Sequence, residues 1–351
     1  MPSRISTDSG KKVRRMNRYA TIVTGWIGLM VVVGCQLALA GEKDQDFLAI
    51  ATGNAKTTAY QIGMDLKALV KPYNIHLSVC PSNGSVENIY AVYQRPGHHL
   101  GLVQSDVMAF VAKLDKDPLM TRINKQVKWV YPLYQQEVHL LARRGIDTLN
   151  DLNGKRVGIG PVESGGYLTG RLLFEITGVH PQGLAAIDDA KALAAIKAGD
   201  LDAMVIVDGS PVWRLMTDVS ASDHLHLVPV VHEAIRSFYP AAHIPGGTYA
   251  WQKDDVATIS VGVILVAYDF HDYRCDTIGR LAYLMRGNLA WLRANGHPKW
   301  KTVRLGENVP GWAPYACVTD YVPPLDLQPS VGMDDNRANP VAEAIRTIFR
   351  P

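Results

Sequence analysis

Cysteine is scarce in this chain, with 4 in 351 residues, and no two have the spacing of a zinc-binding motif. Beyond Cys35, only Cys80, Cys275 and Cys317 remain. An odd number in an exported protein leaves at least one thiol that is free or bridged to another molecule. A Cys275–Cys317 disulfide is compatible with the sequence. Cys80 ends an apolar run, so we expect it to be a small buried core residue.

The sequence signatures of an enzyme are also missing. Ser164 and Ser210 lack the Gly-x-Ser-x-Gly motif of α/β-hydrolases. His224 and His226 share a face of a predicted strand, but no third ligand follows at the spacing of a metal site. We therefore predict a protein with no catalytic residue, no metal site and no cofactor.

Positive charge is concentrated at the N-terminus. Residues 1–40 contain six Lys or Arg and one Asp, whereas the whole chain has 36 Lys and Arg and 33 Asp and Glu. Residues 41–351 thus have 30 basic and 32 acidic side chains, a net charge of −2. This nearly neutral body lacks the basic surface that nucleic acids require, so we expect no nucleic-acid partner.

Residues 1–40 have the features of an export signal peptide. The basic residues 1–18 precede a mostly apolar run from Ala20 to Ala40, and Ala38-Leu39-Ala40 has the form of a signal-peptidase site. The run is also long enough for an uncleaved membrane anchor. Val32-Val33-Gly34-Cys35 in turn resembles a lipoprotein box with Cys35 as the acylated residue. Each alternative places the rest of the chain outside the inner membrane, so we predict a periplasmic protein.

Strand-like and helix-like patterns alternate along the rest of the chain, which predicts an α/β fold with largely parallel sheet. The length is sufficient for two domains. We predict a first lobe in residues 41–138, a second lobe in 139–254 and a return to the first lobe in 255–351. The chain would cross between lobes near Tyr134–Leu140 and Trp251–Ser260, and two crossings make a hinge beside a ligand cleft.

The apolar periodicity predicts individual elements. Strands are expected at Phe47–Ala51, His76–Val79, Leu100–Val103, Val127–Tyr134, Val138–Ala142, Arg156–Ile159, Ala203–Val207, Leu225–Val231 and Ile259–Val266. Helices are expected at Thr58–Val70, Val86–Tyr93, Val107–Leu114, Asp188–Ala198, Val212–Met216, His232–Phe238, Thr277–Ala294 and Pro340–Phe349. A further helix is expected after Gly166 and should end at about Thr177. Ser85 is placed to cap the second of these helices.

Small polar residues follow five of the predicted strands. They are Thr52-Gly53, Ser82–Ser85 and Gln104–Asp106 in the first lobe, and Ser164–Gly166 and Gly209-Ser210 in the second. Helix capping and turn formation explain any one cluster about as well as a binding role does. Five clusters at strand ends instead predict one shared site for a polar or anionic ligand, because helix N-termini favour a carboxylate.

The segments Ala51–Gly63, Ser82–Asn88, Gly101–Asp106 and Asp151–Gly160 carry a family resemblance that covers nearly all of residues 45–300. They look like the corresponding motifs of the TAXI-type solute receptors of TRAP transporters. The resemblance implies a two-lobed periplasmic-binding-protein fold that closes on its ligand as a Venus flytrap does. It also implies that the ligand, an amino acid or organic acid, is delivered to a sodium-driven TRAP-type membrane permease.

The same resemblance implies which residues contact the ligand. They are Thr52, Gly53, Thr58, Tyr60, Ser82, Gly84, Ser85, Gln104, Asp106, Ser164, Gly165, Ser210 and Tyr249. In this scheme Asp106 or Gln104 holds an amine or hydroxyl of the ligand, and Tyr60 covers an apolar portion.

The first loop departs from the family pattern, which is usually glycine-rich and ends in Tyr-Tyr-Pro. Here Asn54-Ala55-Lys56-Thr57 is followed by Ala59-Tyr60-Gln61. Lys56 thereby places a cation near the expected cleft and Glu163 an anion opposite it. The two either change ligand choice or pair across the mouth of the cleft. An acidic amino acid or small dicarboxylate, such as glutamate, is the first ligand class to test.

Two other functions are compatible with the same sequence. The two-lobed fold also serves in periplasmic sensors that signal to a membrane partner, and a neighbouring sensor-kinase gene would favour that role. An enzyme on the same scaffold is a further alternative, which turnover of a bound ligand would support. The absence of a triad or metal motif argues against it.

Overall fold

The computed structural model of the protein describes residues 46–324. The predicted signal peptide in residues 1–40, the lipidation candidate Cys35 and the predicted helix Pro340–Phe349 lie outside the described residues. Within residues 46–324, no helix combines the length and the apolar character needed to pass through a bilayer.

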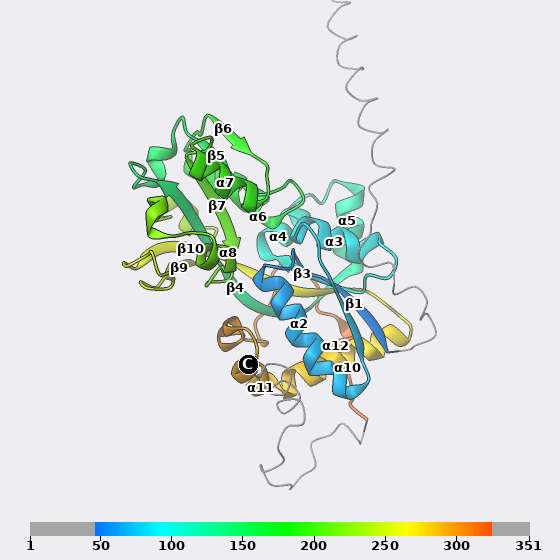
Figure 1. The fold of residues 1–351 in the computed structure, drawn as a ribbon. Helices are drawn as coiled ribbons and strands as arrows, with labels where there is room; N and C mark the ends of the chain where they lie inside the picture. Colours follow the sequence, from blue (N-terminus) through cyan, green and yellow to red (C-terminus); the bar gives the residue numbers. More distant parts are fainter. Residues whose placement is uncertain (1–45, 325–351) are drawn as a thin grey trace, which may run out of the picture. The chain divides into compact units, whose positions relative to one another are not determined.

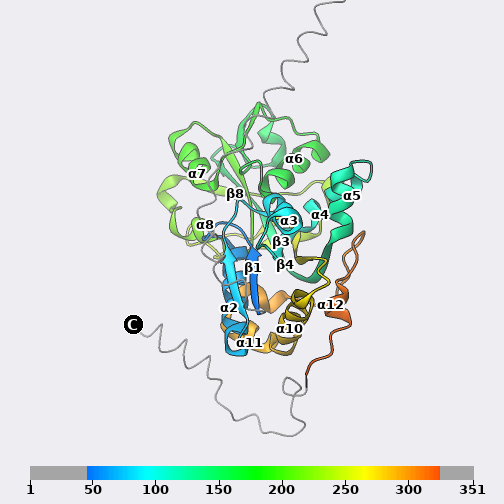
Figure 2. The same cartoon turned by 90° about the vertical axis from the view of Figure 1, so that its right-hand side faces the viewer.

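The described residues form two lobes, drawn in Figures 1 and 2. The first lobe holds β1 (Phe47–Ala51), α2 (Thr58–Val70), β2 (His76–Cys80), α3 (Ser85–Gln94), β3 (Leu100–Gln104), α4 (Ser105–Lys113), α5 (Pro118–Gln126), α10 (Tyr273–Gly287), α11 (Leu289–Asn295) and α12 (Ala316–Thr319). The second lobe holds β5 (Arg156–Gly158), α6 (Gly165–Thr177), β6 (Gly183–Ala185), α7 (Asp189–Ala198), β7 (Ala203–Asp208), α8 (Trp213–Thr217), β8 (Leu225–Val228), α9 (Glu233–Arg236) and β9 (Ala241–Ile244). Two long strands, β4 (Val127–Arg143) and β10 (Val256–Tyr268), belong to both lobes. Short 3₁₀ helices lie at Lys71–Tyr73, Leu149–Leu152, Ala221–Asp223 and Pro298–Thr302.

All of these strands belong to one ten-stranded sheet. Its order is β2-β1-β3-β10-β4-β7-β5-β6, with β8 beside β4 and β9 beside β10. In the first lobe β1 is parallel to β2 and β3, and in the second lobe β5 is parallel to β6 and β7. The central strands β10 and β4 are antiparallel to each other and to their neighbours β3 and β7. Each lobe thus contributes a parallel set of strands, and an antiparallel pair connects the two sets.

Helices cover both faces of the sheet in each lobe. In the first lobe α2 and α10 pack on one face through Leu66 and Leu281, while α3 packs on the other through Ile89. In the second lobe α6 packs on one face through Leu173, and α7 packs on the other through Ile196. Burial on both faces explains why β1, β3 and β7 are almost continuously apolar in sequence.

The predicted α/β fold is confirmed. β1 and α2 have the predicted limits, Phe47–Ala51 and Thr58–Val70. α6 ends at Thr177, and Gly178 follows with φ +69°, the left-handed conformation expected of a helix-ending glycine. The domain limits predicted at residues 138 and 254 stay predictions.

The cap predicted at Ser85 is wrong. α3 begins at Ser85 itself, and the preceding residue, Gly84, is its N-cap. The Ser85 hydroxyl instead accepts a hydrogen bond of 3.1 Å from the backbone N–H of Gln104. The serine therefore joins α3 to the end of β3, which the periodicity of α3 alone does not reveal.

The single helix predicted at Thr277–Ala294 is also wrong, because it is divided into α10 and α11. Asn288 separates them with φ −111° and ψ 23°, outside the helical region. The extended segments predicted at Val127–Tyr134 and Val138–Ala142 are one continuous strand, β4. Helix α5 was not predicted, although Asp117 and Pro118 form a typical helix start in which Asp117 caps the helix.

Cys275 and Cys317 form a disulfide, the pairing that the sequence allowed. The bond connects residues 42 positions apart and joins α10 to α12. Cys80 is buried at the end of β2, as expected from its position in an apolar run. It is also disulfide-bonded, so the prediction that it is only a small core residue is wrong. The disulfide holds the last described helix against the first lobe.

Candidate functional site

A cavity of about 300 Å³ lies between the lobes, at the carboxyl ends of β1, β3 and β7. This is the position at which open α/β sheets bind ligands. The predicted contacts that line it are Thr52, Gly53, Ser82, Gly84, Ser85, Gln104, Ser164 and Gly165. The structure therefore brings together four of the five loop clusters, although their contact with a ligand stays a prediction.

The first-lobe wall of the cavity is held together by Asn88, a fully buried residue of α3. Its side-chain amide donates hydrogen bonds to the carbonyls of Thr52, after β1, and of Leu102, in β3. The Ser82 hydroxyl donates to the Asn88 side-chain oxygen over 2.6 Å. One asparagine thus fixes three segments that are far apart in sequence, which gives the wall a defined shape before any ligand binds.

Two glycines allow the lobes to approach each other closely at the cavity. Gly84 has φ +128°, and a Cβ there would lie 3.3 Å from the Ser164 Cα across the cleft. A Cβ at Gly165 would overlap the side-chain amide of Gln104. Glycine is therefore required at both positions for this arrangement of the lobes.

The N-terminus of α6 points backbone donors at the cavity. Ser164 caps the helix, and its hydroxyl accepts from the N–H of Tyr167 over 3.0 Å. The N–H groups of Gly165 and Gly166 precede the first intrahelical hydrogen bonds, and both residues line the cavity. Such an N-terminus is suited to a carboxylate.

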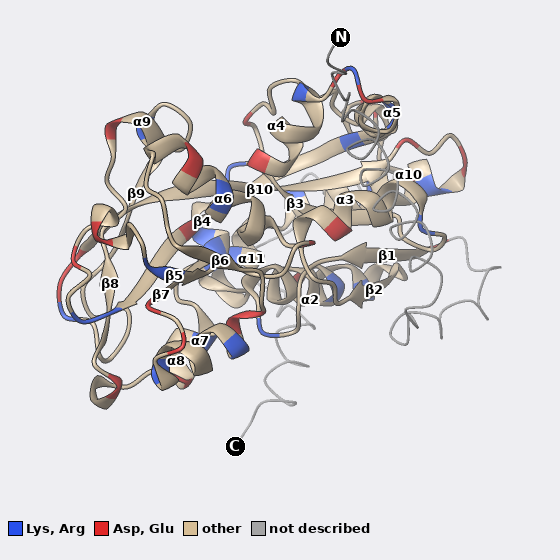
Figure 3. Cartoon of the chain, turned by 90° about the horizontal axis from the view of Figure 1, so that it is seen from above, with Lys and Arg blue, Asp and Glu red and all other residues tan. Residues whose placement is uncertain are grey.

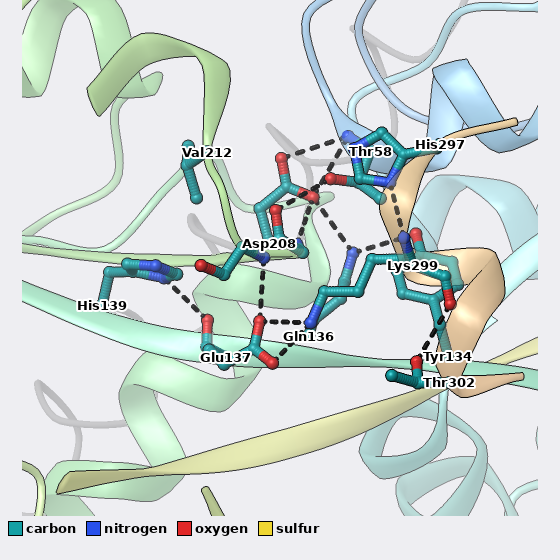
Figure 4. Close-up of polar contacts among 12 residues, drawn as sticks. Thr58, Tyr134, Gln136, Glu137, His139, Asp208, Val212, His297, Lys299 and Thr302 are labelled. Carbon is teal, nitrogen blue, oxygen red and sulfur yellow. Dashed lines mark hydrogen bonds and ion pairs between the residues drawn. The ribbon is translucent and has the colours of Figure 1, made fainter. Parts of the chain in front are cut away.

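The base of the cavity is a polar network around Asp208, shown in Figure 4. Its carboxylate accepts two hydrogen bonds of 3.2 Å from the backbone N–H of Thr58 and one of 3.4 Å from the Gln136 side chain. The Gln136 oxygen accepts in turn from Gln104 over 2.7 Å. Burial raises the pKa of Asp208 to about 7, although hydrogen bonds from Gly209 and Thr58 oppose the shift.

A buried ion pair lies behind this network. The Lys299 ammonium contacts both carboxylate oxygens of Glu137, at 2.5 and 2.7 Å, and both residues are less than a tenth exposed. Glu137 also accepts a hydrogen bond of 2.8 Å from the backbone N–H of Ser210. The pair connects the segment after α11 to β4 and to the loop after β7, as Figure 4 shows.

Five predicted contacts do not line the cavity: Thr58, Tyr60, Asp106, Ser210 and Tyr249. Asp106 instead bridges the lobes elsewhere, accepting hydrogen bonds from the hydroxyls of Thr169 (2.6 Å) and Tyr239 (3.1 Å). Burial raises the pKa of Asp106, against these hydrogen bonds, which lower it.

The other four have identified positions around the cavity. Thr58 holds Asp208 through its N–H, and the N–H of Tyr60 donates to the Thr57 hydroxyl that caps α2. Ser210 donates to Glu137, as described above. Tyr249 is buried, and its hydroxyl accepts from the N–H of Val212 over 3.0 Å. Their positions favour support of the cavity wall over direct contact with a ligand.

Lys56 and Glu163 do not pair with each other. The Lys56 ammonium lies 4.2 Å from the ring centroid of Trp213, in α8. Glu163 accepts a hydrogen bond of 2.7 Å from the side-chain amide of Asn83. Each charged residue therefore contacts the opposite lobe through a different partner.

The charged residues that line the cavity are all acidic: Asp188, Asp189 and Asp208. Elsewhere in the described residues, Lys and Arg are interspersed with Asp and Glu, as Figure 3 shows. The charged side chains that line the cavity are thus of one sign, whereas both signs occur on the rest of the described residues.

Asn83 and Gly166 belong to the predicted clusters, but other lining residues were not predicted: Asn54, Thr57, Gln136, Asp188, Asp189 and Asp208. Asp208 directly follows a predicted buried strand, and that position was sufficient to predict that it lines the site. Asp188 and Asp189 were interpreted only as the start of a helix, which Asp188 indeed caps. Gln136 carries no sequence signal, because it lies inside the long strand β4.

No group of three or more His, Cys, Asp or Glu within residues 46–324 is arranged to hold a metal ion. His226 is engaged otherwise, with its Nε2 atom 3.0 Å from the carbonyl oxygen of Ile146. Of the two histidines considered as metal ligands, His226 is therefore accounted for by its contact with the backbone.

Comparison with known proteins identifies a family. Residues 50–307 match the sequence model of the NMT1-like family. Among solved structures, the periplasmic binding protein BugD has 11% identity and a TM-score of 0.48, with 73% of this chain and 85% of that chain covered. The P235GK mutant of ArgBP from T. maritima has 13% identity and a TM-score of 0.45, with 73% and 95% covered. The aliphatic sulphonate binding protein SsuA from Escherichia coli has 17% identity and a TM-score of 0.39, with 71% and 78% covered. These values are too low to transfer a ligand.

Proposed function

The chain belongs to the NMT1-like family, and we propose that it is an extracytoplasmic solute receptor that captures a small carboxylate-containing ligand. The observation that carries the proposal is the cavity of about 300 Å³ lined by both lobes. Ligand pockets of small molecules start at about this size. Most of the residues that line it are polar or glycine, and the others are apolar.

The ligand carboxylate is assigned to the N-termini of α6 and α3. Both helices are long enough for a substantial dipole, and their first residues, Gly165 and Ser85, line the cavity. Binding there would hold the lobes together, because α3 belongs to the first lobe and α6 to the second. The proposed cycle is capture, closure and release of an unaltered solute, without covalent chemistry.

The proposed partner is a TRAP-type membrane permease, as the TAXI-type motifs imply, and the proposed location is the periplasm. The test is uptake into vesicles that contain a candidate permease. We expect sodium-driven uptake of the ligand only when this protein is added. Uptake that proceeds equally without the protein would exclude the receptor role in transport.

A thermal-shift screen of amino acids and organic acids on the purified protein tests the binding function itself. We expect at least one compound to raise the melting temperature saturably and to be recovered unchanged. A compound that is consumed would instead indicate an enzyme. The absence of any saturable binder across both compound classes would overturn the proposal.

A pair of glycine variants shows whether binding occurs in this cavity. Gly165→Val introduces a side chain where Gln104 lies, so we expect the thermal response to disappear. Gly287→Ala is the control, because a Cβ there meets nothing within 4 Å. If Gly165→Val binds as well as Gly287→Ala does, the ligand site lies elsewhere.

A further inference from the structure

The acidic side chains of the cavity indicate which group the ligand has in addition to its carboxylate. This inference rests on the proposed function. Three carboxylates, from Asp188, Asp189 and Asp208, line the cavity, and no Lys or Arg does. A second anionic group on the ligand would therefore meet side chains of its own charge, and like charges in a confined site are strongly unfavourable.

The three carboxylates differ in what they already bind. Asp188 caps α7 by accepting from the N–H groups of Ala190 and Lys191, at 3.0 and 3.1 Å. Asp208 accepts from Thr58, as described above. Asp189 is half-buried, and its carboxylate has no hydrogen bond or ion pair with any residue in 46–324. One carboxylate at the cavity thus remains without a partner.

Arg214, a positive side chain that acts on Asp189, forms its ion pair with another residue. Arg214 exerts an attraction on Asp189, but its guanidinium pairs with Asp218 at 2.9 Å. Burial raises the pKa of Asp189 to about 6, and its neighbour Asp188 adds to the shift. Buried carboxylates in this situation are stabilised by a cation that reaches them.

A second acceptor in the cavity also lacks a donor. Gln104 is 4% exposed and lines the cavity, and its side-chain oxygen is buried without a hydrogen-bond partner. The nitrogen of the same amide is used by Gln136. Buried acceptors without donors are unusual in native proteins. We therefore expect the ligand to donate hydrogen bonds to both Asp189 and Gln104.

We propose that the cavity binds a solute with a protonated amino group, which Asp189 holds as its direct partner, while the solute carboxylate lies at the N-termini of α3 and α6. The ligand class is therefore a zwitterionic or cationic amino acid. A dicarboxylate without an amine, the class that the sequence alone placed first together with acidic amino acids, does not fit.

The test is calorimetric titration with serine, lysine, glutamate and succinate as probes. We expect serine or lysine to bind most tightly and succinate to bind at least about tenfold more weakly than the best amino acid, because it lacks the amine that a charge-assisted hydrogen bond requires. Succinate binding as tight as that of the best amino acid would overturn this inference, and the proposed receptor function would survive. Failure of all four probes, and of the wider thermal-shift screen, would overturn both.

The residue assignment is tested with Asp189→Asn. We expect this variant to weaken binding of the best amino acid by about tenfold or more. Asp200→Asn is the matched control, because it removes the same charge from an exposed position beyond the other end of α7. We expect it to bind as the unmodified protein does. Affinity of Asp189→Asn within about twofold of the control would contradict the role of Asp189.

Discussion

Asp106 and Asp208 contact opposite lobes in a reciprocal way. Asp106 belongs to the first lobe and accepts from Thr169 and Tyr239 of the second. Asp208 belongs to the second lobe and accepts from the N–H of Thr58 in the first. Burial raises the pKa of both carboxyls. Only Asp208 lines the cavity, so two similar carboxylates between the lobes differ in their access to a ligand.

The difference teaches that sequence position does not decide the role of a polar residue. Asp106 lies in Gly101–Asp106, one of the motifs of the family resemblance, yet its carboxylate accepts from two hydroxyls of the second lobe. Asp208 is the last residue of β7, and the sequence analysis selected Ser210 from the loop that follows it. Both carboxylates already accept hydrogen bonds, so whether the side chain lines the cavity is a better guide to its role than the motif in which it lies.

Lys299→Met should have the largest effect on stability, because Lys299 belongs to the buried ion pair behind the Asp208 network. The substitution leaves the buried Glu137 carboxylate without its cation, and breaking such a pair costs about 3–5 kcal/mol. Denaturant unfolding measures the loss. The double variant Glu137→Gln/Lys299→Met should recover most of it. A single variant as stable as the unmodified protein would show that the pair does not support the cavity.

Asp106→Ala should have the next largest effect, on the protein without ligand. It removes two hydrogen bonds to a charged group, which predicts a loss of about 2–4 kcal/mol in the free energy of unfolding. Tyr239→Phe removes one of the two and should cost less. If Asp106→Ala abolished ligand binding without lowering the melting temperature of the free protein, Asp106 would be a ligand contact and the comparison would fail.

Asp208→Asn should change how stability depends on pH. Burial raises the pKa of Asp208 to about 7 in the folded protein, from an ordinary value of 3.8 for an exposed aspartate. Between these values the folded state binds the proton more tightly, so this group's contribution to stability is complete below about pH 4 and is lost as the pH rises through 7.

The asparagine variant has no such loss, so its stability relative to the unmodified protein should rise by about 1–3 kcal/mol between pH 4 and 8. Taking the difference removes the effect of buried histidines such as His139, whose pKa burial lowers to about 4. Thermal unfolding at several pH values provides the measurement, with Asp200→Asn as the exposed control. A difference that is independent of pH would show that Asp208 titrates normally.

Lys56→Ala should have the smallest effect. The Lys56 ammonium lies over the Trp213 ring at the edge of the lobe contact, where such an interaction is worth about 0.5–1 kcal/mol. Lys56→Arg should retain it. If Lys56→Ala lowered ligand affinity by more than about tenfold, Lys56 would belong to the binding site and not to the edge of the lobe contact.

The fold was predictable because its signals are local. Strands such as Phe47–Ala51 are short apolar runs, and glycines such as Gly178 end their helices. The break at Asn288 was not predictable in this way, because the apolar pattern continues through it from α10 into α11.

The site was predictable only in part, for the same reason. Thr52, Ser85 and Gln104 lie at strand ends, which meet at one edge of a parallel sheet. Whether a residue then faces the cavity or a partner depends on side chains from distant segments. The hydroxyls of Thr169 and Tyr239, which occupy Asp106, carry no sequence signal that connects them to it.

The strands β4 and β10 connect the lobes as a hydrogen-bonded ribbon, with register shifts between Gly262 and Ile264 and between Leu265 and Val266. A ribbon of two paired strands resists swivelling about single bonds, because rotation at one residue would break its ladder. The proposed opening of the lobes would therefore be distributed as torsion along many peptide units. The torsional stiffness of this pair would then set the amplitude of opening, so we expect substitutions at Gly262, beside the cavity-lining Val263, to change how fast a solute escapes.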